Sequence, residues 1–340
     1  IIYGLFQRKA MQKAAIFAEF GFPVQLFTKK YTLLWAKKGA LCMELSYQAA
    51  PEDAGKPLSL FLREQGISAG FIKSVKYGAG FFVNGVPVHT NHRLQPGQTV
   101  RFALPPEQPT TVQPQADIPL HIVYEDDFVL ALNKPAGIAV HPTLNYPGGT
   151  LANAWMAELQ RRNETGVFRP VNRIDKDTSG LVLCAKNSFA APMLAETAEK
   201  RYYALVQGQL PLGRGQIDAP IGRRGDSIIG RCVCENGKPS CTQYTVLAVG
   251  AGHSLVRCRP ITGRTHQIRV HFSYLGHPLA GDDLYGGSRQ HIARQALHCG
   301  RVEFVHPVSR AAMRLECPLP PDFCRLLAEM EVNATTVEHL

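Results

Sequence analysis

The 340-residue sequence lacks two features that would place it in common functional classes, a long apolar run and a phosphate-binding loop. It contains no run of eighteen apolar residues, so no membrane-spanning helix is predicted. It also contains no glycine-rich phosphate-binding loop, because Gly222–Gly225 is typical of a basic hairpin tip and not of a nucleotide fingerprint. We therefore predict neither membrane association nor a cofactor.

The nine cysteines lack the paired spacing of a disulfide framework or of a zinc site. Their number is odd and several lie in apolar contexts such as Leu183–Ala185, which is typical of free thiols in a reducing cytosol. Cys232, Cys234 and Cys241 leave a metal site as an alternative. A zinc site usually needs Cys-x-x-Cys pairs or Cys/His clusters, so we favour a hairpin with incidental thiols and predict no metal.

The charge of the chain is basic and unevenly distributed. The formal net charge is +10 and the isoelectric point is about 9.2, a balance that suits a phosphate-bearing partner. Residues 1–42 contain seven Lys or Arg and one Glu, a net +6, which leaves +4 for residues 43–340. Most of the excess positive charge therefore lies in the first 42 residues.

The most informative segment is residues 171–183, with the sequence VNRIDKDTSGLVL. Arg173 and Asp175 lie two residues apart, and Thr178–Gly180 has the composition of a tight turn. The apolar run 181–185 that follows predicts a buried strand. Two interpretations of the segment stay open at this point: a catalytic loop with one carboxylate and one guanidinium, or a solvated Asp/Arg turn.

This segment resembles the signature of the RluA-type RNA pseudouridine synthases, usually written His-Arg-Leu-Asp-x-x-Thr-Ser-Gly. Further stretches match that family in the right order, and together they cover residues 120–325: 132–142, 200–208, 260–271, 275–282, 294–298 and 304–307. Two positions depart from the signature. Ile174 in place of Leu is nearly neutral in shape, whereas Asn172 in place of His removes an ionisable group and puts in doubt any proton-handling role there.

The resemblance implies roles for the residues that match the family. Asp175 is expected to be the nucleophile, because the reaction needs a carboxylate beside the sugar and the base. Asp177 is interpreted as a surface or turn residue. Arg264 matches the basic residue that pairs with the nucleophile, since a desolvated Asp needs a nearby cation to stay ionised. A phosphate contact is the alternative for Arg264, and Arg269 is its rival for either role.

The remaining expected site residues serve RNA binding and base flipping. Tyr202 matches the tyrosine that packs on the uracil ring, with a half-buried strand tyrosine as the alternative. Arg173 resembles the side chain that fills the gap left by the flipped base. Ile268 is a candidate for the apolar floor under the uracil. His266 and His271 are interpreted as structural or phosphate-facing.

A small module precedes the matched region. Residues 56–102 predict two helices followed by a hairpin with an Asn-Gly turn, and they resemble an S4 RNA-binding domain with a net charge of +5. Lys73 and Lys76 are its candidate phosphate contacts. The arginine usual between the two helices is replaced by Ala69–Phe71, which predicts a weaker grip on RNA. An ordinary α/β module with solvated lysines is the alternative.

The domain organisation follows from these matches and from a Pro/Gln/Thr-rich linker. We expect a basic N-terminal extension, an S4-like domain, a linker, a catalytic domain and a tail, at residues 1–42, 43–104, 105–117, 118–330 and 331–340. The extension begins with Ile1 and matches nothing in the family. It is interpreted as a gene-model extension before Met43, as an RNA-contacting arm, or as a transit peptide.

The expected fold class is α+β: a pseudouridine synthase fold with a mixed, largely antiparallel sheet and a central cleft, plus the small S4-like α/β domain. Strands are predicted at residues 122–124, 129–132, 181–185, 203–207, 241–249, 255–259 and 268–272. Helices are predicted at residues 151–161 and 192–199.

The sequence thus predicts an enzyme that isomerises specific uridines to pseudouridine in structured RNA. Large-subunit rRNA is the favoured partner and tRNA the second. A non-catalytic RNA-binding or ribosome-assembly protein on the same scaffold is the alternative, at which Asn172 hints. We expect a cytoplasmic monomer.

Overall fold

The computed structural model describes residues 31–35, 41–107, 110–144, 146–225 and 227–332. These residues divide into two compact units. The first consists of residues up to Leu58 and of Val75–Leu104, and the second of Ser59–Ser74 and of residues from Pro105 onward. The helical residues 59–74 of the expected S4-like module therefore group with the larger unit, and the domain boundaries given above stay a prediction.

The first unit contains a five-stranded antiparallel sheet of order β1-β2-β5-β3-β4. Its strands are β1 (Tyr31–Trp35), β2 (Leu41–Gln48), β3 (Phe81–Val83), β4 (Val86–Val88) and β5 (Thr99–Ala103), and a short 3-10 helix spans Pro51–Asp53. The predicted Asn-Gly hairpin turn is confirmed, because Asn84 and Gly85 join β3 to β4 with φ of 49° and 81°. Of the N-terminal extension, residues 1–30 and 36–40 lie outside the described residues.

Both helices predicted between residues 56 and 80 are present, as α2 (Leu58–Glu64) and α3 (Ala69–Tyr77). Ser68 precedes α3, and its hydroxyl accepts a hydrogen bond from the Phe71 amide (3.2 Å), which satisfies a free donor of the first turn. Lys73 and Lys76 lie exposed on α3, as phosphate contacts require.

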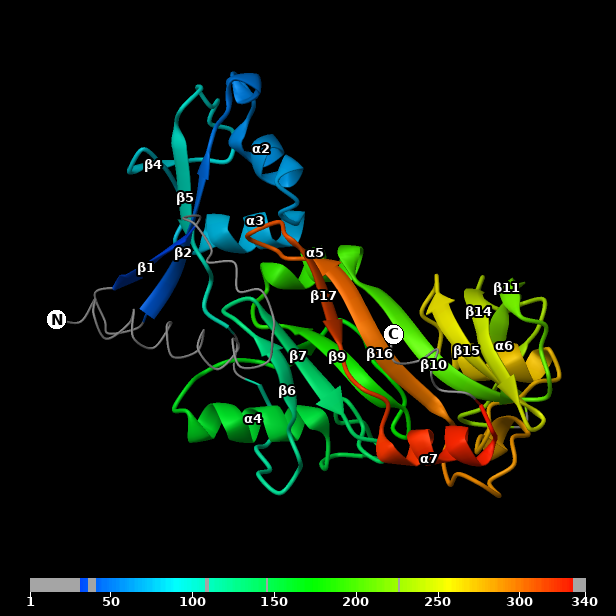
Figure 1. Ribbon diagram of the computed structural model, residues 1–340. Helices are drawn as coiled ribbons and strands as arrows, with labels where there is room; N and C mark the ends of the chain where they lie inside the picture. Colours follow the sequence, from blue (N-terminus) through cyan, green and yellow to red (C-terminus); the bar gives the residue numbers. More distant parts are fainter. Residues whose placement is uncertain (1–30, 36–40, 108–109, 145, 226, 333–340) are drawn as a thin grey trace. The chain divides into compact units, whose positions relative to one another are not determined.

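The second unit is built on a ten-stranded sheet (Figure 1). Its main order is β11-β14-β15-β10-β16-β9-β7-β6, with β17 paired to β16 and β8 paired to β9. The strands are β6 (Ile122–Glu125), β7 (Val129–Lys134), β8 (Arg169–Pro170), β9 (Ser179–Ala185), β10 (Glu199–Gln207), β11 (Gly213–Asp218), β14 (Cys241–Gly250), β15 (His253–Pro260), β16 (Leu297–Val305) and β17 (Ala312–Glu316). Every pair is antiparallel except β9 with β16, so the predicted mixed, largely antiparallel α+β fold is confirmed.

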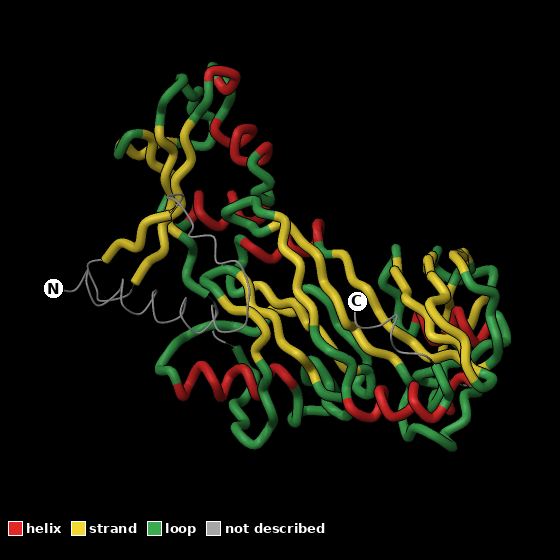
Figure 2. Tube along the Cα trace, in the orientation of Figure 1, coloured by secondary structure: helices red, strands yellow, loops and turns green. Residues whose placement is uncertain are grey.

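Helices flank this sheet (Figure 2). The strands β12 (Ile221–Arg223) and β13 (Arg231–Val233) form a separate two-stranded sheet. The helices are α4 (Leu151–Arg161), α5 (Ala190–Thr197), α6 (Gln267–Tyr274) and α7 (Pro321–Glu329). α4 begins where predicted, because Thr150 caps it by a reciprocal arrangement with Asn153. No helix in the described part of the chain is both long and apolar enough to cross a membrane.

The strand predicted at residues 268–272 is wrong, because these residues form α6. Ile268, Val270 and Phe272 alternate with polar residues as in a half-buried strand. All six residues from Gln267 to Phe272 are buried, so the helix shows no polar face from which its period could be recognised. His266 directly precedes the helix, and its φ of 58° is left-handed and not extended.

Gly180 sets the close approach of β9 to β16. Its φ is 111°, and a Cβ at this position would overlap with the backbone carbonyl of Cys299 on β16. The parallel pairing of these two strands, which fixes the end of the 171–178 loop, therefore requires glycine here.

We predict that Gly180→Ala lowers the free energy of unfolding by about 3 kcal/mol or more, through backbone strain and overlap together. Chemical denaturation measures the change. Gly70→Ala is the matched control, because Gly70 lies in α3 with open space around its Cα. That variant should stay within about 1 kcal/mol of wild type. Equal stability of the two variants would contradict the interpretation.

Candidate active site

The loop of residues 171–178 runs beside β9 and is tied to it by Asn172. The Asn172 side chain is buried. Its carbonyl oxygen accepts a hydrogen bond from the Leu183 amide (2.7 Å), and its amide donates to the Leu181 carbonyl (3.1 Å). One side chain thus satisfies a backbone donor and a backbone acceptor of β9, at residues where neither β8 nor β16 pairs with it. Asn172 therefore orients the loop, and nothing in these contacts requires an ionisable group.

Lys134 holds the same loop from the end of β7. Its side chain is fully buried, and its Nζ donates to the carbonyls of Pro135 and Lys176, each at 2.8 Å. Burial lowers the pKa of Lys134 to about 7, although Asp177 and Asp175 both act to raise it. An amine that is only partly protonated at neutral pH is therefore fixed to the segment that carries both aspartates.

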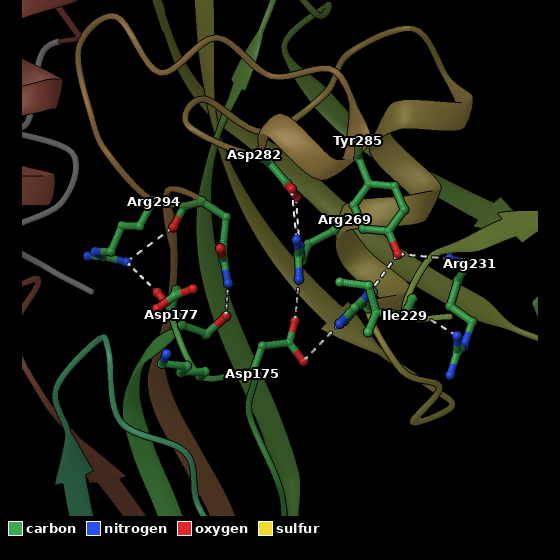
Figure 3. Close-up of polar contacts among 12 residues, drawn as sticks. Asp175, Asp177, Ile229, Arg231, Arg269, Asp282, Tyr285 and Arg294 are labelled. Atoms are coloured by element: carbon green, nitrogen blue, oxygen red, sulfur yellow. Dashed lines mark hydrogen bonds and ion pairs between the residues drawn. The ribbon is translucent and has the colours of Figure 1, made fainter. Parts of the chain in front are cut away.

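Arg294 fixes the loop at a third point (Figure 3). Its Nη1 donates to the carbonyl of Asp177 (3.2 Å). Its Nε and Nη2 bind both carboxylate oxygens of Asp322 on α7, at 2.6 and 3.0 Å. The backbone around Asp175 is thereby connected to β7, to β9 and to the C-terminal helix.

The carboxylate of Asp175 is paired with Arg269 of α6. Arg269 Nη1 donates to Asp175 Oδ2 (3.0 Å), while its Nε and Nη2 bind both oxygens of Asp282 at 2.6 and 2.8 Å (Figure 3). The Asp282 side chain is fully buried, that of Arg269 is 8% exposed and that of Asp175 is 27% exposed. The two carboxylates raise the pKa of Arg269 against the effect of its burial, so the cation is permanent.

Tyr285, at the end of a 3-10 turn (Asp283–Tyr285), packs under this pair. The Arg269 guanidinium lies 5.0 Å from the centre of the Tyr285 ring, a cation–π distance. The Tyr285 oxygen also lies 2.7 Å from Nδ1 of His266 and accepts a hydrogen bond from the Arg231 amide (3.1 Å). The buried Tyr285 hydroxyl thus has Nδ1 as its acceptor, which assigns the ring proton of neutral His266 to Nε2.

Nε2 of His266 lies 3.9 Å from Asp175 Oδ1, on the side of the carboxylate away from Arg269. Burial lowers the pKa of His266 below its ordinary value, although the Asp175 charge acts to raise it. Asp175 therefore faces one permanent cation and one mostly neutral imidazole at neutral pH. This asymmetry leaves Oδ1 the less strongly bound of the two carboxylate oxygens.

Tyr202 lies buried on β10, opposite Cys258 of β15 and Cys299 of β16. Burial raises its pKa well above 10, and Cys299 and the charge of Asp175 act in the same direction. The hydroxyl therefore stays protonated and offers a neutral aromatic surface. Of the predicted site residues, the structure joins Asp175 and Arg269 in an ion pair and buries Tyr202 on β10.

The predicted pairing of Arg264 with Asp175 is wrong. Arg264 Nε donates to the Pro239 carbonyl (3.2 Å), whereas the rival Arg269 makes the ion pair. The physical reason is that residues 267–274 are helical and not extended. The helix turns Arg269 inward between two carboxylates and leaves the exposed Arg264 on the loop before it.

The other predicted residues lie in different environments. Arg173 is exposed on the loop and makes no hydrogen bond or ion pair with the described residues. Ile268 is buried in α6. His271 is buried too, and its two ring nitrogens contact the Thr242 hydroxyl (2.8 Å) and the Ala219 carbonyl (3.0 Å), so it is structural as expected.

Sequence reasoning missed four residues that organise the site: Lys134, Asp282, Tyr285 and Arg294. Three of them lie inside stretches that match the family, but no local pattern distinguishes a buried charge from a solvated one. In the described part of the chain, no three His, Cys, Asp or Glu side chains are grouped so that they could hold a metal ion.

We predict that Lys134 makes stability rise with pH above neutrality. Its folded pKa of about 7 lies below the unfolded value of 10.5, so the unfolded chain binds more protons between these limits. The free energy of unfolding should therefore gain up to about 1.4 kcal/mol per pH unit from this group. Urea denaturation at pH 7 to 10 should show this gain in wild type and its loss in Lys134→Met. Parallel curves for the two proteins would contradict it.

A second prediction concerns the buried ion pair. Arg269→Met leaves Asp282 charged and unpaired, and should lower the free energy of unfolding by about 3–5 kcal/mol. Adding Asp282→Leu should recover most of that loss, because no charge then remains buried. Arg264→Met is the control and should change stability by less than about 1 kcal/mol. An Arg269→Met effect as small as the control would refute the assignment.

Comparison with known proteins identifies the family of the chain. Residues 128–274 match the RNA pseudouridylate synthase family. An uncharacterised RNA pseudouridine synthase of Bacillus subtilis is 40% identical over 270 residues, which cover 78% of this chain and 95% of that protein. Ribosomal large subunit pseudouridine synthase D of Xanthomonas campestris is 37% identical, over 76% of this chain and 83% of that protein.

The solved structure of human RNA pseudouridylate synthase domain containing 4 is similar in fold. It superimposes with a TM-score of 0.50 at 22% identity, over 63% of this chain and 94% of that one. Together with the sequence identities, this places the chain in the RluA-type RNA pseudouridine synthase family, as an RNA pseudouridine synthase.

Proposed function

We propose that this synthase isomerises specific uridines in structured RNA, with large-subunit rRNA as its target. The support for the target is the name of several relatives, ribosomal large subunit pseudouridine synthase D, at 36–40% identity. The exposed lysines of α3 and the basic charge of the chain suit a partner rich in phosphates.

The reaction breaks the bond between N1 of uracil and C1′ of ribose, turns the base, and joins C5 to C1′. The proton on C5 leaves and N1 gains one, so the product is an isomer of the substrate. We assign Asp175 as the group that attacks C1′ or stabilises the positive charge there. The observation that carries this assignment is the partly exposed carboxylate, fixed through Oδ2 by an arginine that is itself buried.

The remaining roles follow from the surroundings of Asp175. Tyr202 is proposed to stack on the detached uracil, because it matches the family's tyrosine and its buried hydroxyl is not ionised. Ile268 is proposed as part of the apolar floor, since it is buried beside Arg269 in α6. Arg173, exposed and without a described partner, is proposed to fill the stack after the base is flipped.

The small N-terminal module is proposed to add RNA affinity as an S4-like domain, through Lys73 and Lys76. A cytoplasmic location is proposed as well, supported by the eight cysteines between positions 184 and 324, which are free thiols. A monomer without metal or cofactor completes the proposal.

The alternative of a non-catalytic RNA-binding protein rested on Asn172 and on the S4-like loop that lacks its usual arginine. The contacts of Asn172 with β9 give that residue an orienting role that a synthase also needs. They therefore remove one of the two reasons for preferring the alternative.

We predict that Asp175→Asn folds normally and loses at least about a thousandfold in pseudouridine formation, because an amide offers no charged nucleophile. The measurement is pseudouridine mapping of an unmodified large-subunit rRNA transcript incubated with each protein. Asp177→Asn, the same chemical change two residues away, is the matched control and should retain most activity. Turnover by Asp175→Asn would assign the chemistry to another group.

A further inference from the structure

A groove of about 600 Å³ lies across strands β10, β11, β14 and β15. Four arginines line it and no carboxylate does. We refer to it as the arginine groove, and its side chains include Arg201, Arg214, Arg257, Arg259, Gln216 and Gln243. None of these residues belongs to the site around Asp175.

The arginine groove lies on the face of the sheet opposite α6. Tyr244 of β14 contacts Phe272 of α6, with ring centres 5.3 Å apart, and its cross-strand partner is Cys258. Cys258 also pairs with Tyr202, so Tyr202 and α6 share one face of the sheet. Because side chains alternate along a strand, Arg257 and Arg259 project from the other face.

Few acidic groups balance the charge of the arginine groove. Glu199 accepts hydrogen bonds from Arg259 (2.7 Å) and Arg201 (3.2 Å). Arg214 and Arg257 make no ion pair or hydrogen bond with the described residues. In addition, Nη1 of Arg201 is buried without a hydrogen-bond partner in the described part of the chain.

The four guanidinium groups of the groove outnumber the carboxylates that pair with them, Glu199 and Glu303. Guanidinium groups in excess of their counterions repel one another unless an anion binds between them. The fork of a guanidinium fits the oxygens of a phosphate, and the amides of Gln216 and Gln243 add donors of the kind that bind phosphate and ribose. Tyr244 also borders the groove, but its ring packs on Phe272 of α6, on the other face of the sheet. The chemistry of the groove therefore suits a phosphodiester backbone.

We propose that the arginine groove is a second RNA-binding site, which holds the phosphate backbone of the substrate RNA away from the target uridine. This inference rests on the proposed function, since it takes RNA as the substrate. β11 is the edge strand of the sheet, so an RNA fold that passes this edge contacts both faces. An RNA that contacts both faces of the sheet must be large and structured. The contacts of its backbone with the arginine groove contribute affinity without recognising the sequence.

The test measures RNA binding as a function of salt. The probe is an unmodified transcript of large-subunit rRNA, and the variants are Arg214→Ala, Arg257→Ala and the double substitution. Each phosphate contact contributes about 0.7–0.9 to the slope of log K against log salt. The double variant should therefore lower the magnitude of the slope by about 1.4–1.8 and weaken binding by roughly tenfold at physiological salt. The single-turnover rate at saturating RNA should remain unchanged.

Arg161→Ala is the control for loss of one exposed positive charge, because Arg161 lies on α4, away from the four strands of the groove, with its side chain 71% exposed. It should leave the slope as in wild type. Gln216→Lys tests the reverse change at an exposed position of the groove, and should steepen the slope by about 0.7–0.9. This gain does not depend on the double variant keeping its fold.

Wild-type slopes in both the double variant and Gln216→Lys would overturn the inference, as would an effect of Arg161→Ala equal to that of Arg214→Ala. Failure of the proposed function is a separate result. In that case the wild-type protein forms no pseudouridine in the transcript, whatever the slopes are. If the wild type modifies the transcript and the slopes do not change, the second site alone is refuted.

Discussion

The buried ion pair between Arg269 and Asp282 is the interaction on which the site depends. A guanidinium removed from water is stable only if its charge and its donors are matched. Asp282 meets this need with two hydrogen bonds, at 2.6 and 2.8 Å, which leaves Nη1 free to hold Asp175 at 3.0 Å. The inner carboxylate thus fixes the arginine, and the arginine in turn fixes the outer, partly exposed carboxylate.

The backbone around Asp175 is held as firmly as its side chain. Lys134 and Arg294 bind the carbonyls of the two residues that follow it, and Asn172, three residues before it, binds main-chain groups of β9. Groups held in this way need no rearrangement when charge develops during a reaction, which is the main source of catalytic power in such sites. A loop with only surface contacts would have to be ordered at each turnover.

Much of the fold could be predicted because its signals are local. The apolar run 181–185, the capped helix 151–161 and the Asn-Gly turn each carry their own pattern, and the structure contains all three. α6 could not be predicted, since a helix buried on every side shows no polar face. The pairing of Asp175 with Arg264 was inferred separately, from the family resemblance, and the structure gives that place to the rival Arg269, which α6 turns inward.

The residues around Asp175 could not be predicted from local patterns for a related reason. Asp282 and Lys134 are charged residues in ordinary-looking segments, and their burial is decided by long-range packing. Asp175 itself was singled out as a site residue only through family resemblance. The residues alone left a solvated turn as the simpler interpretation.

The two adjacent tyrosines of β10 show how tertiary structure decides chemistry. Tyr203 packs in the cluster formed with Phe323 and Leu326 of α7, whereas Tyr202, the preceding residue, projects from the opposite face of the sheet.

The pairing of β10 with β16 shifts between Arg201 and Tyr202, where β16 has one additional residue, Gly300. A side chain at position 300 would overlap with the Tyr203 ring, so glycine permits this bulge. Because a shift of one residue exchanges the faces of a strand, this bulge helps to determine which tyrosine packs against α7 and which projects from the face that carries α6.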